Sequence, residues 1–65
     1  MVNAREFSLS ELATCAEREV GWRRRVYPGR VASHRMSQGE ADRQVAMMEE
    51  IARRLRLEAQ AELLI

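Results

Sequence analysis

The side chains best able to do chemistry in this sequence are one cysteine, one histidine and a run of arginines beside aromatic residues. Cys15 and His34 together would supply the thiolate and imidazole that nucleophilic catalysis uses. Nothing in the sequence would orient the histidine, and no glycine-rich turn would supply an oxyanion site. We therefore expect no catalytic residue and no enzyme, and we interpret Cys15 as a small apolar packing residue.

Metal and cofactor sites are not indicated. One cysteine, one histidine and scattered carboxylates do not show the ligand spacing of a metal site. The glycine-rich motifs that bind phosphates or dinucleotides are absent from the sequence. We expect no metal and no cofactor.

The arginine run indicates a surface for a macromolecular partner. Arginines beside a stacking aromatic residue are a known nucleic-acid-binding arrangement. However, three consecutive arginines spread over about 200° of a helix, so they cannot all face one groove. Cations near a helix C-terminus are also favourable because they complement the helix dipole. The residues predicted to contact a partner are Trp22, Arg23, Arg24, Arg25, Tyr27, Arg30, Arg35 and Met47.

Size and composition describe one small helical domain, residues 1–65. The chain is 46% apolar and 32% charged, which is typical of a folded protein. A domain of this size buries only about 60% of its unfolded surface, so its core is marginal. One cysteine excludes an internal disulfide, which leaves helix packing and self-association as sources of stability.

Charge is small overall but uneven along the chain. The formal net charge is +1, and every basic residue is arginine. Residues 18–35 contain six arginines against one glutamate, whereas residues 36–65 contain four arginines against six acidic residues. No apolar run approaches the roughly 20 residues of a membrane span, and no signal-peptide core is present. A single unpaired cysteine suits a reducing compartment, so we expect a cytoplasmic protein of a bacterial host cell without a membrane role.

Two helix-start signals define the predicted elements. Residues 1–6 are expected to fray; Ser8 and Glu11 then form a capping box that begins a helix over residues 9–26. Pro28 is expected to end or kink that helix at Tyr27, because proline disfavours helical backbone in the residue before it. Residues 28–36 are predicted to form a short helix or turn, with His34 tolerating a left-handed conformation. Ser37 and Glu40 form a second box that begins a helix over 38–62.

The periodicity of the apolar residues predicts an all-α fold in which the two helices pair as an antiparallel hairpin. A short third element is expected between them, and the hairpin is expected to self-associate. The main stripes are Leu9, Leu12, Ala13, Ala16, Val20 and Tyr27 in the first helix and Ala41, Val45, Met48, Ala52, Leu55, Ala59 and Leu63 in the second. A second, narrow strip on the first helix, and the apolar end of the second, would remain uncovered in a monomer. The predicted oligomer interface is Cys15, Trp22, Val26, Leu63, Leu64 and Ile65.

About half of the chain resembles a group of small, largely uncharacterised helical proteins encoded by bacteriophages, prophages and other mobile elements of proteobacteria. The matching segments are residues 18–20, 23–28 (Arg-Arg-Arg-Val-Tyr-Pro), 29–38, 40–43 and 45–49. His34 stands where that group commonly has glycine. The corner is also similar to SHOCT, a short C-terminal helical domain that serves in oligomerisation or docking.

The resemblance implies an accessory protein of a mobile element and supplies no catalytic residue. The function expected is non-enzymatic binding, in its most concrete form an anti-CRISPR-like inhibitor that occludes a site on a host defence complex. The alternatives are a small nucleic-acid-binding accessory protein that uses the arginine run, and a pure oligomerisation module. The partners expected are a host or phage protein or nucleoprotein complex, with nucleic acid and a second copy of the chain as further candidates.

Overall fold

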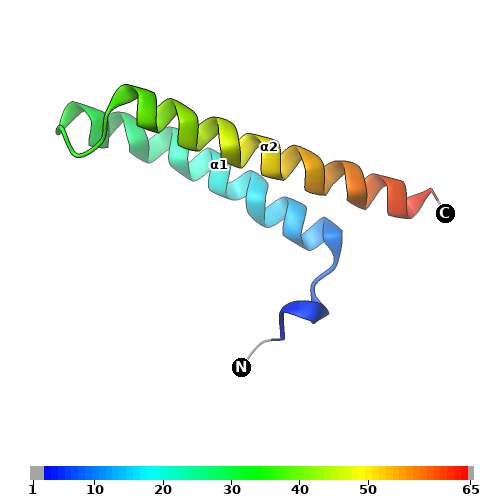
Figure 1. Cartoon of the computed structure of the whole chain (residues 1–65). Helices are drawn as coiled ribbons and strands as arrows, with labels where there is room; N and C mark the ends of the chain where they lie inside the picture. The colour runs from blue at the N-terminus through cyan, green and yellow to red at the C-terminus, as the bar shows by residue number, and fades with distance from the viewer. Residues whose placement is uncertain (1–2, 65) are drawn as a thin grey trace.

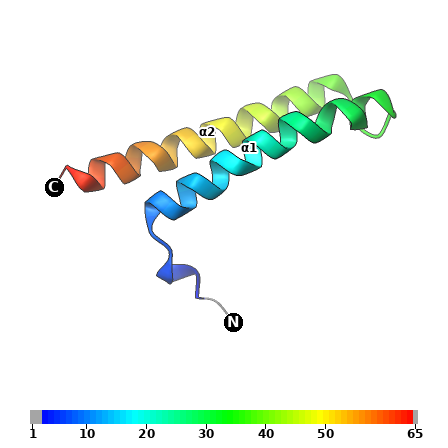
Figure 2. The ribbon, with the colours of Figure 1, turned by 180° about the vertical axis from the view of Figure 1, so that it is seen from behind.

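Two long helices lie side by side and antiparallel in the computed structural model, which describes residues 3–64 (Figure 1). Helix α1 spans Leu9–Ala32 and helix α2 spans Gln38–Leu63. A 3₁₀ turn, η1 (Ala4–Glu6), precedes them and turns away from the hairpin. The turn between α1 and α2 forms one end of the molecule, and both chain termini lie toward the other (Figure 2). The predicted all-α antiparallel hairpin is confirmed.

The hairpin is one layer of helices thick. Its principal extents are 47 × 29 × 14 Å. The radius of gyration, 14.6 Å, exceeds the roughly 11 Å expected of a compact domain with 65 residues. A single layer has two broad sides, and neither is covered by another element of the described chain. No helix within residues 3–64 combines the length and the apolar character needed to cross a membrane.

A side-chain cap precedes the first turn of each helix, at the residue that the sequence predicts. The Ser8 hydroxyl accepts from the backbone N–H of Glu11 at 3.1 Å, and the Glu11 carboxylate accepts from the backbone N–H of Ser8 at 3.1 Å. This is a complete capping box. At α2 the Ser37 hydroxyl accepts from the Glu40 N–H at 3.1 Å, and only this half of the predicted second box forms.

Helix α1 does not end at Tyr27. It continues through Pro28 to Ala32, so the predicted boundary at residue 26 is wrong. Of the short helix or turn predicted over 28–36, residues 28–32 belong to α1 and only a turn from residue 33 onward joins the helices. Proline inside a helix removes one backbone hydrogen bond and costs about 3 kcal/mol. Two contacts accompany the passage through Pro28: Tyr27 is buried in the core, and the Arg30 guanidinium stacks on the Tyr27 ring within the same helix.

His34 closes α1 in the left-handed conformation that the sequence suggested, with φ = 61°. The Arg35 N–H donates to the Arg30 carbonyl at 2.9 Å, and the His34 N–H donates to the Val31 carbonyl at 3.1 Å. These two bonds are the pair that defines a Schellman motif, which usually has glycine at the left-handed position. The chain therefore reverses within five residues, 33–37.

Alanine dominates the contact between the helices. Residues at alternating spacings of four and three face each other, as in an antiparallel coiled coil. The core cluster joins Ala16, Val20 and Ala52, with Met48 and Leu55 packed against it. Small side chains let the two backbones approach closely, but they bury little apolar area.

One side of the hairpin is joined by ion pairs between the helices. Arg56 donates to both carboxylate oxygens of Glu17, at 3.0 and 2.8 Å, and to the Thr14 hydroxyl at 3.2 Å. Arg24 pairs with Glu49 on the same side. The hydrogen bond from Arg56 holds the pKa of Glu17 below its ordinary value. We call the four residues Glu17, Arg24, Glu49 and Arg56 the ion-paired side.

Candidate partner-binding surface

An aromatic–arginine stack lies near the turn end of α1. The Arg30 guanidinium carbon lies 5.3 Å from the centroid of the Trp22 ring and 5.7 Å from that of Tyr27. The two rings meet edge to face at 6.5 Å between centroids. These distances suit cation–π and aromatic pairing, so the stack fixes the position of Trp22 although that side chain is 40% exposed.

A shallow groove runs along the outer surface of α1 beside this stack. It is lined by Cys15, Arg18, Glu19, Gly21, Trp22 and Arg25. Arg18 and Arg25 are both exposed, and neither forms an ion pair with a described residue. Their guanidinium groups, seven residues apart on one helix face, are available to an anionic partner.

Three of the residues predicted to contact a partner are instead engaged within the hairpin. Tyr27 is only 7% exposed and belongs to the core. Arg23 donates to the Glu19 carboxylate at 3.0 Å and to the Gln44 carbonyl at 2.9 Å, with its side chain only 20% exposed. Arg24 pairs with Glu49 on the neighbouring helix. Because one helix turns by about 100° per residue, consecutive arginines had to diverge in this way.

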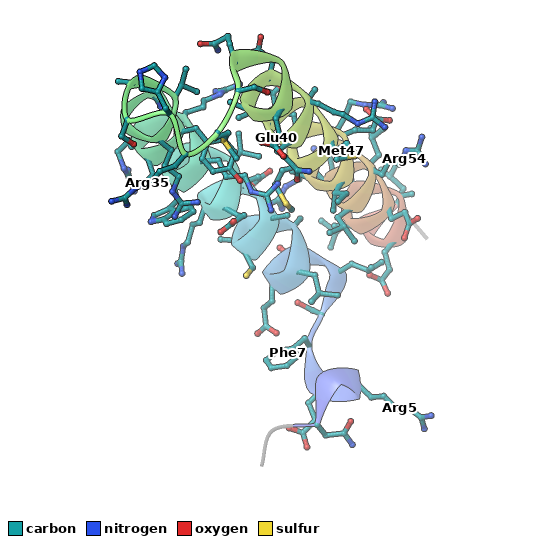
Figure 3. All side chains as sticks on the ribbon, turned by 60° about the vertical axis from the view of Figure 1, so that its left-hand side comes forward. Arg5, Phe7, Arg35, Glu40, Met47 and Arg54 are labelled. Atoms are coloured by element: carbon teal, nitrogen blue, oxygen red, sulfur yellow. The ribbon has the colours of Figure 1, made fainter. Side chains whose placement is uncertain are left out.

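The other predicted contact residues lie on the surface. Trp22, Arg25, Arg30 and Arg35 are exposed at the turn half of the molecule, and Met47 is exposed on α2. Figure 3 shows Arg35 at the turn, with Met47 and Arg54 along α2 and Phe7 set apart near the N-terminus. Arg18 was not among the predicted contacts. The signal for it was its spacing of seven from Arg25, which places both on one face of α1.

The residues predicted to form an oligomer interface are solvent-accessible to different degrees. Cys15 is exposed rather than packed inside, contrary to its interpretation as a packing residue. Val26 is half-buried, and Leu63 and Leu64 are 86% and 88% exposed at the end of α2. Ile65 lies outside the described residues.

The two halves of the hairpin carry opposite charge. The turn half, residues 21–48, contains six arginines and two acidic residues. The open half, which comprises the remaining residues toward the two termini, contains five arginines and eight acidic residues. The net charge of +1 is therefore the sum of a positive half and a negative half, which together give the molecule an electric dipole along its long axis.

No group of three or more histidine, cysteine or acidic side chains is placed to hold a metal ion within the described part of the chain. No protein-family model matches the sequence, and neither the curated proteins nor the solved structures contain a significant match.

Proposed function

We propose that this protein is a non-enzymatic binding protein that covers an acidic surface of a larger partner with the outer surface of α1. The observation that carries the proposal is the exposed Trp22 ring, held by Arg30 beside the unpaired Arg18 and Arg25. Aromatic and arginine side chains are the residue types that contribute most to binding at interfaces. A pre-positioned ring also loses little rotamer entropy when a partner covers it.

The similarity to small mobile-element proteins directs the proposal toward an inhibitor of a host defence complex, encoded by a phage and comparable in action to anti-CRISPR proteins. The supporting features are the small size of the chain, its surface arginines and the motif over residues 18–49. An inhibitor of this kind acts by occupying a site that the host complex needs for its own ligand. Protein–nucleoprotein complexes are therefore the first targets to test.

Affinity capture from a bacterial lysate tests the proposal when charge-reversed variants are compared. Arg18→Glu combined with Arg25→Glu reverses the two unpaired guanidinium groups, and we expect it to abolish capture of the partner. Arg53→Glu combined with Arg54→Glu is the matched control, because these arginines pair with Glu50 on the outer surface of α2. Loss of capture by both variants equally would contradict the proposed surface.

Nucleic acid binding is the second candidate function, favoured by the stackable Trp22 ring between guanidinium groups. Nuclease treatment of the lysate separates the two candidates. Capture that survives digestion supports a protein partner, whereas capture that disappears supports nucleic acid. A gel shift that weakens steeply with salt, and is lost in the Arg18/Arg25 variant, would establish the second candidate directly.

A further inference from the structure

A second hollow on the outer surface of α1 adjoins the groove beside Trp22. Its lining includes the apolar side chains of Phe7 and Leu12, which are 45% and 39% exposed. Cys15 and Arg18 line both hollows, so the two are continuous. Together they follow one face of α1 over residues 10–25, a length of roughly 22 Å. We call this continuous surface the α1 groove.

Charged side chains recur along the α1 groove at intervals of seven residues. Glu11, Arg18 and Arg25 are all exposed and lie on one face of the helix, roughly 10 Å apart along its axis. Glu11 also completes the capping box, whereas the two arginines form no ion pair with a described residue. A complementary occupant therefore carries two acidic groups and, beyond them, one basic group at the same spacing.

The groove favours a helix over the other occupants that could present acidic groups. An extended peptide binds mainly through main-chain hydrogen bonds to a free strand edge. Between its ends, a helix has already bonded its own backbone N–H and C=O groups, so α1 offers no such edge. A nucleic-acid strand is disfavoured by Glu11, because its phosphates are uniformly negative. A helix bonds its own backbone and can carry both signs of charge along one face.

We infer that the occupant of the α1 groove is an amphipathic helix of the partner that runs antiparallel to α1, an inference that rests on the proposed function. Its acidic residues, at positions i and i+7, lie opposite Arg25 and Arg18. Apolar residues at i+4 and i+11 cover Trp22 and enter the hollow beside Phe7. A basic residue at i+14 lies opposite Glu11. The antiparallel direction places acid toward the N-terminus of the partner helix and base toward its C-terminus, where each complements the helix dipole.

Trp22 supplies the measurement, because it is the only tryptophan of the chain and is 40% exposed. The probe is an alanine-based helical peptide of about 20 residues, long enough to hold helical structure in water. It carries glutamate at i and i+7, leucine at i+4 and i+11, and lysine at i+14. The control peptide has lysine in place of each glutamate and glutamate in place of the lysine. We call these the matched and the charge-exchanged peptides.

Binding of the matched peptide should shift the fluorescence emission of Trp22 to shorter wavelength, because the peptide covers the ring. The wild-type chain should bind the matched peptide about 10-fold tighter than the charge-exchanged one, since three exposed pairs change from attraction to repulsion. Arg18→Glu combined with Arg25→Glu should invert this preference and keeps Trp22 as the reporter. If wild type and variant prefer the same peptide, the two arginines do not face the occupant and the inference is overturned.

Gly21→Leu tests the same groove by filling it. A Cβ at Gly21 meets no atom within 4 Å, so the hairpin should remain folded, which circular dichroism checks. The leucine side chain should weaken binding of the matched peptide about 10-fold, because it occupies space that the partner helix needs. Gly39→Leu is the control, since Gly39 has equally open surroundings but lies on α2. Equal binding by the two folded variants would place the peptide elsewhere and overturn the inference.

Failure of the inference is distinguishable from failure of the proposed function. If neither peptide shifts the emission of Trp22 while lysate capture still depends on Arg18 and Arg25, the partner helix is refuted and the acidic partner stands. Capture that is independent of these arginines refutes the proposed function itself. A short single-stranded oligonucleotide that shifts the emission where the matched peptide does not would identify nucleic acid as the occupant. A peptide with the matched residues in reverse order fits a parallel helix, and its tighter binding would overturn the antiparallel direction.

Discussion

Individual residues at the helix ends account for much of how the chain turns. His34 occupies the left-handed position of a Schellman motif, with φ = 61°, where a side chain with a Cβ is strained. Ser8 and Ser37 supply hydroxyl caps at the starts of α1 and α2. Each of these contacts is local, so each is visible in the sequence.

Replacing His34 with glycine should stabilise the hairpin by about 1 kcal/mol, because glycine adopts the left-handed conformation without steric cost. Urea denaturation monitored by circular dichroism measures the change. His34→Ala is the control, since it removes the imidazole but keeps the Cβ. If His34→Ala stabilises the protein as much as His34→Gly, the imidazole rather than the backbone conformation is the source of strain.

Between the elements, ion pairs on one side fix how α1 and α2 align. Glu17 accepts two bonds from Arg56, and the pairing of Arg24 with Glu49 lies further toward the turn. Glu50, by contrast, binds Arg53 and Arg54 within α2, and these hydrogen bonds lower its pKa to about 2. Exposed pairs of this kind are partly screened by solvent, so they set register more than they add stability.

Acid should remove the contribution of the Glu17–Arg56 pair. The folded-state pKa of Glu17 lies below its ordinary value of 4.5, so the pair stabilises the hairpin above that pH. The stabilisation is lost as the pH falls below 4.5 through the folded-state pKa. The melting temperature of wild type should therefore exceed that of Glu17→Gln at neutral pH, and the difference should vanish in strong acid. Glu58→Gln controls for the loss of one negative charge; an identical pH profile would argue against the pair.

For the whole molecule, the small size of the core limits the stability of the fold. Two helices in one layer bury seven residues of which five are alanine, so each larger side chain at the contact has a disproportionate effect. Leu55 packs against the central cluster, whereas Leu57, two residues later, is half exposed on the outer surface.

Leu55→Asp should therefore unfold the protein, because it places a carboxylate in the core at a cost of several kcal/mol. Its helical circular dichroism at 25 °C should be largely lost. Leu57→Asp introduces the same charge on the same helix and should retain the signal. A cooperative melting curve for Leu55→Asp like that of wild type would show that the core does not lie where the apolar stripe places it.

The amino-acid sequence by itself determined the two helices, their first residues, the left-handed corner at His34 and the antiparallel pairing of apolar stripes. These features depend on short-range hydrogen bonds and periodicity, which the residues at caps and stripes specify directly. Tertiary structure decided that α1 passes through Pro28, a continuation that accompanies the burial of Tyr27 in the core. It likewise decided that Arg23 and Arg24 bind partners within the hairpin, whereas Arg18 and Arg25 form no ion pair with the described residues. Which guanidinium finds a partner depends on the neighbouring helix, and no local pattern in the chain contains that information.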